Sequence, residues 1–202
     1  MSIRKLIYDN KDRLKPFLSA IGYDYKHWTR HVLYKECFDL INGLHPEHMD
    51  VLEVSAGKTF QDIEFKSFTE FNYPEFDICI DKLDKQCDLV IADQVFEHLL
   101  YPYRAGKNVY DMVKPGGYFL VATPFLIKIH PMPFDCSRWT ETGIKYFLHE
   151  CGFPLEGIQA WSWGNRACVK ANFKNWAPRG WFGSLKNEPS YPVTVWALAK
   201  KQ

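Results

Sequence analysis

The sequence lacks several features that would assign it to a particular class of protein. It has no long apolar run, so we expect no membrane-spanning segment, and its first residues, MSIRKLIYDN, lack the hydrophobic core of a secretion signal. Its net charge is only +1, which gives no electrostatic reason to expect nucleic acid or a membrane surface as a partner. Repeats and low-complexity linkers are also absent, so a single domain over residues 1–202 is the simplest interpretation.

The six cysteines form no CxxC pair, which argues against a structural zinc site. Their even number permits disulfides, but nothing else in the sequence looks secreted. We therefore expect reduced thiols and a cytoplasmic location, while noting that an excised domain of a longer polypeptide would look the same. Apolar residues make up 47% of the chain and aromatic residues 16%, and we assign most of the aromatic side chains to core packing.

Apolar runs that alternate with helical patterns predict an α/β fold. Continuous apolar strands are typical of a mostly parallel sheet with helices on both faces, here with seven strands. The last two strands lack a helix long enough for a normal crossover between them, so we expect an antiparallel edge strand. Helices are expected at 3–20, 25–43, 103–113 and 141–153, and strands at 49–56, 63–71, 75–80, 87–93, 118–125, 157–163 and 193–200.

The stretch VLEVSAGKTF, residues 51–60, runs from an apolar strand into a turn of small residues, as a parallel strand leads into a phosphate-binding loop. Only Gly57 stands where a dinucleotide loop has three glycines. In open α/β sheets, ligands bind beyond the carboxyl ends of the strands. The residues that follow each predicted strand, many of them polar, are therefore the candidates for a site.

Three segments in order, VLEVSAG, CDLVIADQVFEHL and MVKPGGYFLVATP, resemble class I S-adenosylmethionine (SAM)-dependent methyltransferases, most closely the ubiquinone-biosynthesis-like or type 11 group. The resemblance covers about residues 49–155. It implies a Rossmann-like fold and SAM as the cofactor. Residues 1–48 would then form N-terminal helices, 49–155 the cofactor-binding core, and 156–202 the last strands with an aromatic insertion.

Carried over by position, the resemblance places Glu53 as the acid of the first family motif, with Ser55 and Gly57 in the glycine loop. Ser55 and Thr59 replace two of the usual glycines. SAM carries no pyrophosphate, so this departure weakens a phosphate-binding interpretation more than a SAM-binding one. A surface acid at the end of a strand remains the alternative for Glu53.

The other cofactor contacts implied by the resemblance follow the second, third and fourth strands. Asn72 stands near the position of the acid that holds the ribose hydroxyls, and Asp81 at that of the acid that meets the adenine amino group. A turn role for Asn72 and a capping role for Asp81 stay open. The residues expected to border the methionine end and the reacting centre are Ala92, Asp93 and Gln94.

Methyl transfer from a sulfonium is a direct displacement, and a hydroxyl acceptor also needs a base. We predict His130 as that base with Asp135 as its partner, and His98 as a further candidate. The alternatives are an Asp135–Arg138 salt bridge, a helix cap, and a structural role for His98. No acid and amide cluster like that of catechol-type methyltransferases can be located, so we expect no metal. We also expect no metal ion at His45 and His48, because these residues precede the first strand and lie at the edge of the sheet opposite the site.

The acceptor is predicted to be a small molecule, and specifically a hydroxyl of a deoxysugar in a glycan. Candidate substrate-binding residues are Arg138, Trp139, Trp163, Asn165 and Arg166, although the last three would equally hold the C-terminal insertion in place. A non-sugar acceptor is a further alternative. The rival functions are a nicotinamide-dependent oxidoreductase, which would need the missing three-glycine loop, and a non-catalytic domain that only binds a partner or SAM.

Overall fold

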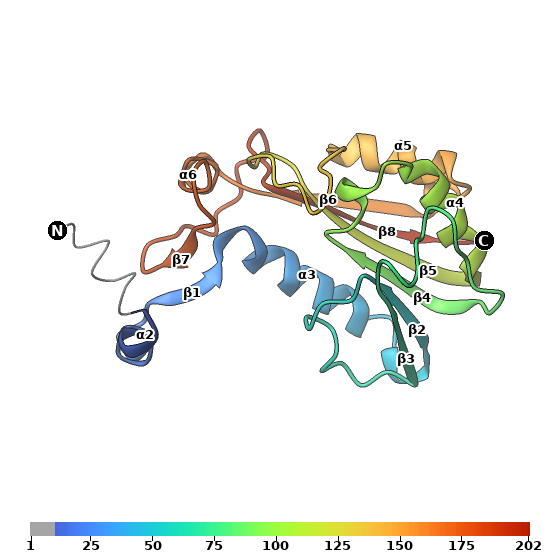
Figure 1. The fold of residues 1–202 in the computed structure, drawn as a ribbon, viewed down its shortest axis with the longest axis horizontal. Coiled ribbons are helices and arrows are strands. Elements are labelled where there is room, and N and C mark those ends of the chain that lie inside the picture. Colours follow the sequence, from blue (N-terminus) through green and yellow to red (C-terminus); the bar gives the residue numbers. More distant parts are fainter. Residues whose placement is uncertain (1–10) are drawn as a thin grey trace.

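The structure is a computed structural model that describes residues 11–202, so residues 3–10 of the first predicted helix lie outside the described part. Its centre is a six-stranded sheet with helices on both faces (Figure 1). The helices are α2 (Lys11–Ala20), α3 (His31–Asn42), α4 (Pro102–Met112), α5 (Glu141–Glu150) and α6 (Arg166–Ala171), with 3₁₀ helices η1 (Trp28–Arg30), η2 (Pro46–His48), η3 (Phe96–His98) and η4 (Leu155–Gly157). The strands are β1 (Asp24–His27), β2 (Asp50–Val54), β3 (Ser67–Phe71), β4 (Cys87–Asp93), β5 (Val113–Pro124), β6 (Ile158–Trp163), β7 (Pro178–Gly180) and β8 (Thr194–Lys200).

The central sheet has the strand order β3-β2-β4-β5-β8-β6. Strands β3, β2, β4 and β5 pair in parallel, whereas β8 runs antiparallel to both of its neighbours. The predicted antiparallel pairing at the end of the chain is therefore present, with β6 at the edge and β8 beside it. The mostly parallel Rossmann-like sheet is confirmed.

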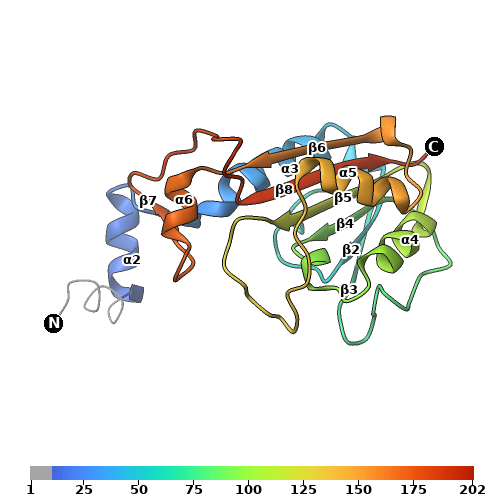
Figure 2. The same cartoon turned by 90° about the horizontal axis from the view of Figure 1, so that it is seen from above.

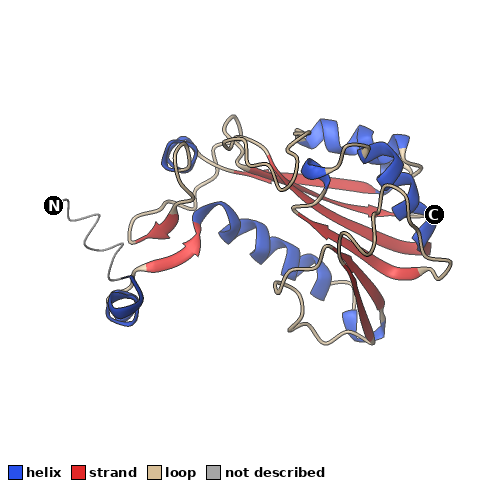
Figure 3. Cartoon of the chain, in the orientation of Figure 1, coloured by secondary structure: helices blue, strands red, loops and turns tan. Residues whose placement is uncertain are grey.

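Both faces of the sheet are buried because its strands are apolar at consecutive positions. In β4, Leu89 and Ile91 face α3, while Val90 and Ala92 face α4 and α5. Figure 3 shows the resulting three layers, with α3 below the sheet and α4 and α5 above it. The apolar stripe of α3, formed by Leu33, Cys37 and Ile41 at four-residue spacing, supplies the lower layer.

Two predicted elements are wrong. The segment 75–80 forms turns in place of a strand, which leaves six strands in the described sheet and not seven. A hydrogen bond from Asp81 N to Asp77 O closes one of these turns. The helix predicted over 25–43 begins only at His31, because residues 24–27 form β1 and pair with β7.

A small lobe lies beyond the end of the sheet. It combines α2 and β1 from the start of the chain with α6 and β7 from the insertion between β6 and β8, and Figure 2 shows these elements gathered at one end of the molecule. Trp181 Nε1 donates a hydrogen bond to Ile21 O, and Trp28 Nε1 donates to Ser184 O. These contacts tie the N-terminal segment to the insertion between β6 and β8. No helix among the described residues combines the length and apolar character needed to cross a membrane.

Helices α4 and α5 approach each other closely at Gly106. A β-carbon at this position would clash with Cys151 Sγ and lie 3.1 Å from the Phe147 ring. Gly106 is buried, and its helical position would otherwise favour alanine by about 1 kcal/mol. The glycine is therefore kept by packing, against helix propensity.

The Gly106→Ala variant should lose about 1–3 kcal/mol of stability, because overpacking outweighs the gain in helix propensity. Urea denaturation measures this loss as a lower midpoint. Adding Cys151→Ala removes the clashing sulfur, so the double variant should recover part of the loss relative to the sum of the two single changes. Strictly additive effects would contradict this account of the helix contact.

Candidate active site

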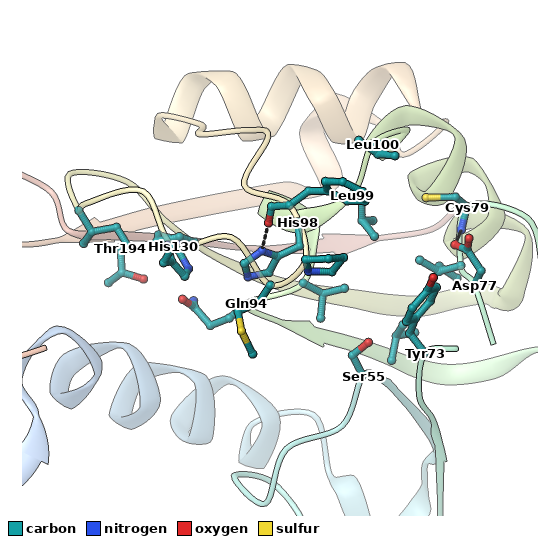
Figure 4. Close-up of a pocket in the computed structure, with 18 of the residues that line it drawn as sticks. Ser55, Tyr73, Asp77, Cys79, Gln94, His98, Leu99, Leu100, His130 and Thr194 are labelled. Atoms are coloured by element: carbon teal, nitrogen blue, oxygen red, sulfur yellow. Dashed lines mark hydrogen bonds between the residues drawn. The ribbon is translucent and has the colours of Figure 1, made fainter. Parts of the chain in front are cut away.

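A cavity of about 620 Å³ opens at the carboxyl ends of β2, β4 and β5. Its walls come from the loops that follow these strands and β3, from β1 and η1, and from the C-terminal insertion. Figure 4 shows two groups of side chains on its walls. Ser55, Tyr73, Asp77 and Cys79 gather at one end, and Gln94, His98, His130 and Thr194 at the other.

The backbone turns sharply out of β2 and β4 at the pocket. Ser55 and Gln94, the residues that directly follow these strands, have φ angles of 53° and 58°. This left-handed conformation is uncommon for residues other than glycine and is found most often at functional sites. Hydrogen bonds hold both turns, from Ser55 N to Phe71 O at 2.7 Å and from Gln94 N to Ala122 O at 2.8 Å. Ser55 and Gln94, both predicted from the sequence, therefore lie at the pocket.

The first end of the pocket, which we call the tyrosine–aspartate end, is formed by Ser55, Tyr73, Asp77 and Cys79. Asp77 Oδ1 accepts a hydrogen bond from Cys79 N at 2.9 Å. Asp81 instead closes the local turn, since its Oδ2 accepts from Asp77 N at 2.8 Å. Neither exposed Asn72 nor Asp81 lines the cavity; their near neighbours Tyr73 and Asp77 do, and sequence reasoning missed this shift.

Two acidic side chains lie beneath the strand ends, on the α3 side of the sheet. Burial, reinforced by the charge of Asp93, raises the pKa of Glu53 to about 7, although the Gly57 N–H opposes this shift. Burial also raises the pKa of Asp93, whose Oδ2 accepts a hydrogen bond from the Tyr34 hydroxyl at 2.9 Å. One oxygen of each carboxylate is buried without a hydrogen-bond partner. Predicted Ala92 is fully buried in the core and supports the site through packing.

At the other end of the pocket, Glu97, His98 and His130 form what we call the histidine–glutamate cluster. Glu97 Oε1 lies 3.5 Å from His98 Nε2 and 4.0 Å from His130 Nε2. The Glu97 side chain is 0% exposed, and neither of its oxygens has a hydrogen-bond partner. Burial raises the pKa of Glu97 to about 8, and burial lowers the pKa of His130. The two predicted histidines thus meet Glu97, which the sequence places beside His98 but does not pair with His130.

Asp135 holds His130 in place, as predicted from the sequence. Its Oδ2 lies 3.3 Å from His130 Nδ1 and accepts a hydrogen bond from His130 N at 2.8 Å. Arg138 grips both oxygens of the same carboxylate, and these bonds lower the pKa of Asp135 to about 2. The Asp135–Arg138 salt bridge and the His130 contact therefore coexist. Trp139 packs its ring against Phe147, and neither Arg138 nor Trp139 lines the cavity.

Three residues of the C-terminal segment hold the insertion in place. Trp163 is buried and donates from Nε1 to Leu185 O, and Asn165 caps α6 by accepting from Cys168 N. Exposed Arg166 bonds Glu188 at 2.7 Å. None of them lines the cavity, so the predicted substrate-binding role does not fit their positions. Trp176 does line it, 5.4 Å from the His130 ring, and only the aromatic richness of the insertion pointed to it.

The buried Glu53 makes stability depend on pH. Between about pH 4.5 and 7 the folded state binds the Glu53 proton more tightly than the unfolded chain does. The contribution of Glu53 to the free energy of unfolding is therefore full below pH 4.5 and is lost as the pH rises through 7. The Glu53→Gln variant should therefore gain on the order of 2 kcal/mol relative to wild type between pH 4.5 and 8.

Urea denaturation at a series of pH values measures this difference. The matched control is Glu70→Gln, since Glu70 is the exposed acid paired with Glu53 across β2 and β3, and its profile should follow that of the wild type. Parallel profiles for the wild type and Glu53→Gln would contradict the account of a buried carboxylate without a compensating partner.

Comparisons with known proteins agree with this arrangement. Residues 53–121 match a family model described as a methyltransferase domain. A curated protein of Mycolicibacterium smegmatis, described as a probable S-adenosylmethionine-dependent methyltransferase, is 28% identical over 120 residues, which cover 56% of this chain and 43% of that protein. The match thus spans less than half of the relative's length.

Two solved structures share the fold. One, from Archaeoglobus fulgidus, is a SAM-dependent methyltransferase with a TM-score of 0.57 and 14% identity, over 85% of this chain and 94% of that chain. The other, from Thermotoga maritima, has a TM-score of 0.57 and 11% identity, over 98% and 99% of the two chains. Residues 53–121 thus match a methyltransferase-domain model, and the chain shares its fold with these two structures, which together support SAM as the cofactor.

Proposed function

We propose that this protein is a methyltransferase that transfers the methyl group of SAM to a hydroxyl of a small molecule. The observation that carries this proposal is the division of one pocket into two chemically different ends. The tyrosine–aspartate end has an aromatic ring and a carboxylate, and the far end has two histidines. Near-neutral charge and a concave pocket favour a small acceptor over nucleic acid.

We propose one orientation for SAM in this pocket. Its adenosine would lie at the tyrosine–aspartate end, where Tyr73 offers a ring face and the Asp77 carboxylate can accept hydrogen bonds from hydroxyl or amino groups. Its methionine part would pass the turns at Ser55 and Gln94, above Glu53 and Asp93. Burial raises the pKa of both acids, and a nearby positive charge would favour their ionised forms, so they suit the sulfonium and ammonium groups of SAM.

The acceptor would then lie at the histidine end, and we propose a hydroxyl of a sugar, with a deoxysugar of a glycan as the specific candidate. Trp176 provides an aromatic surface there of the kind that packs against a sugar ring, and Thr194 lines the same end. The pocket is otherwise rich in apolar side chains such as Ile127 and Met132, which suits a sugar that lacks a hydroxyl.

The chemistry needs alignment and a proton acceptor. Methyl transfer joins the acceptor oxygen to the methyl carbon as the carbon–sulfur bond breaks, and the sulfur keeps the electron pair. We propose that His130 Nε2 accepts the hydroxyl proton, because Asp135 binds the opposite ring nitrogen and fixes the ring. No other side chain is needed for this proton transfer.

The cofactor orientation is tested by calorimetric titration with SAM, S-adenosylhomocysteine and NAD. The wild type should bind both sulfur ligands and not NAD. The Asp77→Asn variant should bind S-adenosylhomocysteine roughly tenfold more weakly, because a charged hydrogen-bond acceptor is lost. The Asp81→Asn variant is the matched control, since the amide oxygen can still accept from Asp77 N and the side chain lies outside the pocket. Binding of NAD alone, or equal losses in both variants, would contradict the assignment.

The catalytic end is tested by methyl transfer to a panel of nucleotide sugars and short glycans. His130→Ala should lower kcat by about 100-fold or more while leaving the affinity for S-adenosylhomocysteine unchanged. The control His45→Ala removes an exposed histidine far from the pocket and should keep wild-type kcat. The non-catalytic alternative would be favoured if the wild type binds SAM but methylates no acceptor in the panel, and if His130→Ala keeps the same affinity for S-adenosylhomocysteine.

A further inference from the structure

We propose that the histidine–glutamate cluster of Glu97, His98 and His130 is a binding site for one divalent transition-metal ion of the zinc or manganese type. Among the described residues, these three side chains form the group whose ligand atoms all lie within 4.8 Å of one another. The inference runs against the expectation of metal-independent catalysis drawn from the sequence.

Both histidines present the correct nitrogen to the centre of the cluster. His98 Nδ1 lies 2.5 Å from Phe134 O, and because a carbonyl only accepts, this nitrogen carries the proton. His130 Nδ1 faces only acceptors, Asp135 Oδ2 at 3.3 Å and Lys128 O at 3.4 Å. Each Nε2 is therefore left with a free lone pair beside Glu97. Metal-binding histidines are typically held in this way, by a carbonyl or carboxylate at the opposite nitrogen.

The separations suit a metal after a small closure. Ligands about 2.1 Å from a tetrahedral zinc ion lie about 3.4 Å apart. Here the Glu97–His98 separation is 3.5 Å and the Glu97–His130 separation is 4.0 Å. Two imidazoles and one carboxylate favour zinc, manganese or iron over magnesium and calcium. Three protein ligands leave at least one coordination position open, and His98 and His130 line the pocket into which it would point.

The buried Glu97 supplies an independent observation. Its side chain is 0% exposed and both oxygens lack a hydrogen-bond partner, although the two histidine Nε2 atoms lie 3.5 and 4.0 Å from Oε1. A buried carboxylate without a partner is costly, and proteins usually pair such groups or use them to bind metal ions. Asp135, by contrast, is fully engaged by Arg138, so Glu97 is the carboxyl group of this region that is left free to bind an ion.

The metal site rests on the proposed function in one respect only: the acceptor would bind at the histidine end of the pocket and contact the ion there. With an ion bound, His130 acts as a ligand and the ion, in place of the ring, makes the acceptor hydroxyl more acidic. Asp135 and Arg138 are then positioning residues that fix the ligand ring. Metal binding itself needs neither SAM nor an acceptor.

The test is calorimetric titration of chelator-treated full-length protein with ZnCl₂ and MnCl₂, with MgCl₂ for comparison and without SAM. The wild type should bind one equivalent of zinc or manganese much more tightly than magnesium. Glu97→Gln and His98→Ala should abolish this binding. Asp135→Asn should weaken it by about 10–100-fold, because only the orientation of His130 is lost.

The matched control is the His45→Ala/His48→Ala variant. Both histidines flank exposed Glu47 at 3.5 and 3.6 Å, so they form a similar trio without burial or oriented rings, and the variant should bind metal as the wild type does. Thermal unfolding without metal checks folding, and Glu97→Gln should be at least as stable as wild type because a buried ionisable group without a hydrogen-bond partner is removed. Absence of one-site binding, or unchanged affinity in Glu97→Gln, overturns the metal site and leaves SAM binding and the proposed function intact.

Discussion

The parallel pairing of β2 and β4 is the constraint on which the site depends. The chain leaves β2 toward β3 on one side and leaves β4 toward β5 on the other, so the two connections diverge and open a crevice at the carboxyl ends of the strands. The left-handed turns at Ser55 and Gln94 stand on either side of this crevice. Loops that follow the neighbouring strands complete the site, since Tyr73 and Asp77 follow β3 and His130 follows β5.

The two ends of the strands treat charge in opposite ways. At their amino ends, Lys114 bonds Asp88 at 2.8 Å and Asp50 at 3.2 Å, so the acids are paired. At their carboxyl ends, Glu53 and Glu97 are buried with oxygens that lack partners, and burial raises the pKa of both. Buried carboxyl groups without partners reduce the stability of the fold, so stability alone does not explain them. Their concentration at one edge indicates that ligands complete the electrostatics of the site.

The sequence predicted the elements whose periodicity is strong and placed the pocket correctly. Apolar runs located β4 and β8 to within a residue. The short apolar segment at 75–80 was predicted as a strand because periodicity cannot distinguish a buried turn from a short buried strand. The same turn explains why Asp77, and not Asp81, faces the pocket. Glu97 escaped notice as a partner of His130 because 33 positions separate them, and only the fold brings them together. Trp176 was not predicted either, because it lies far from His130 in the sequence and in an insertion without a regular hydrophobic pattern.

A crystal structure of the protein with bound S-adenosylhomocysteine tests the central claim most directly, since it shows both the pocket and the direction of the ligand. The account predicts adenosine beside Tyr73 and Asp77, the amino acid part near the turns at Ser55 and Gln94, and the sulfur facing His98 and His130 across the space for the acceptor. A ligand with its sulfur turned away from the histidines, or bound outside this pocket, would contradict it.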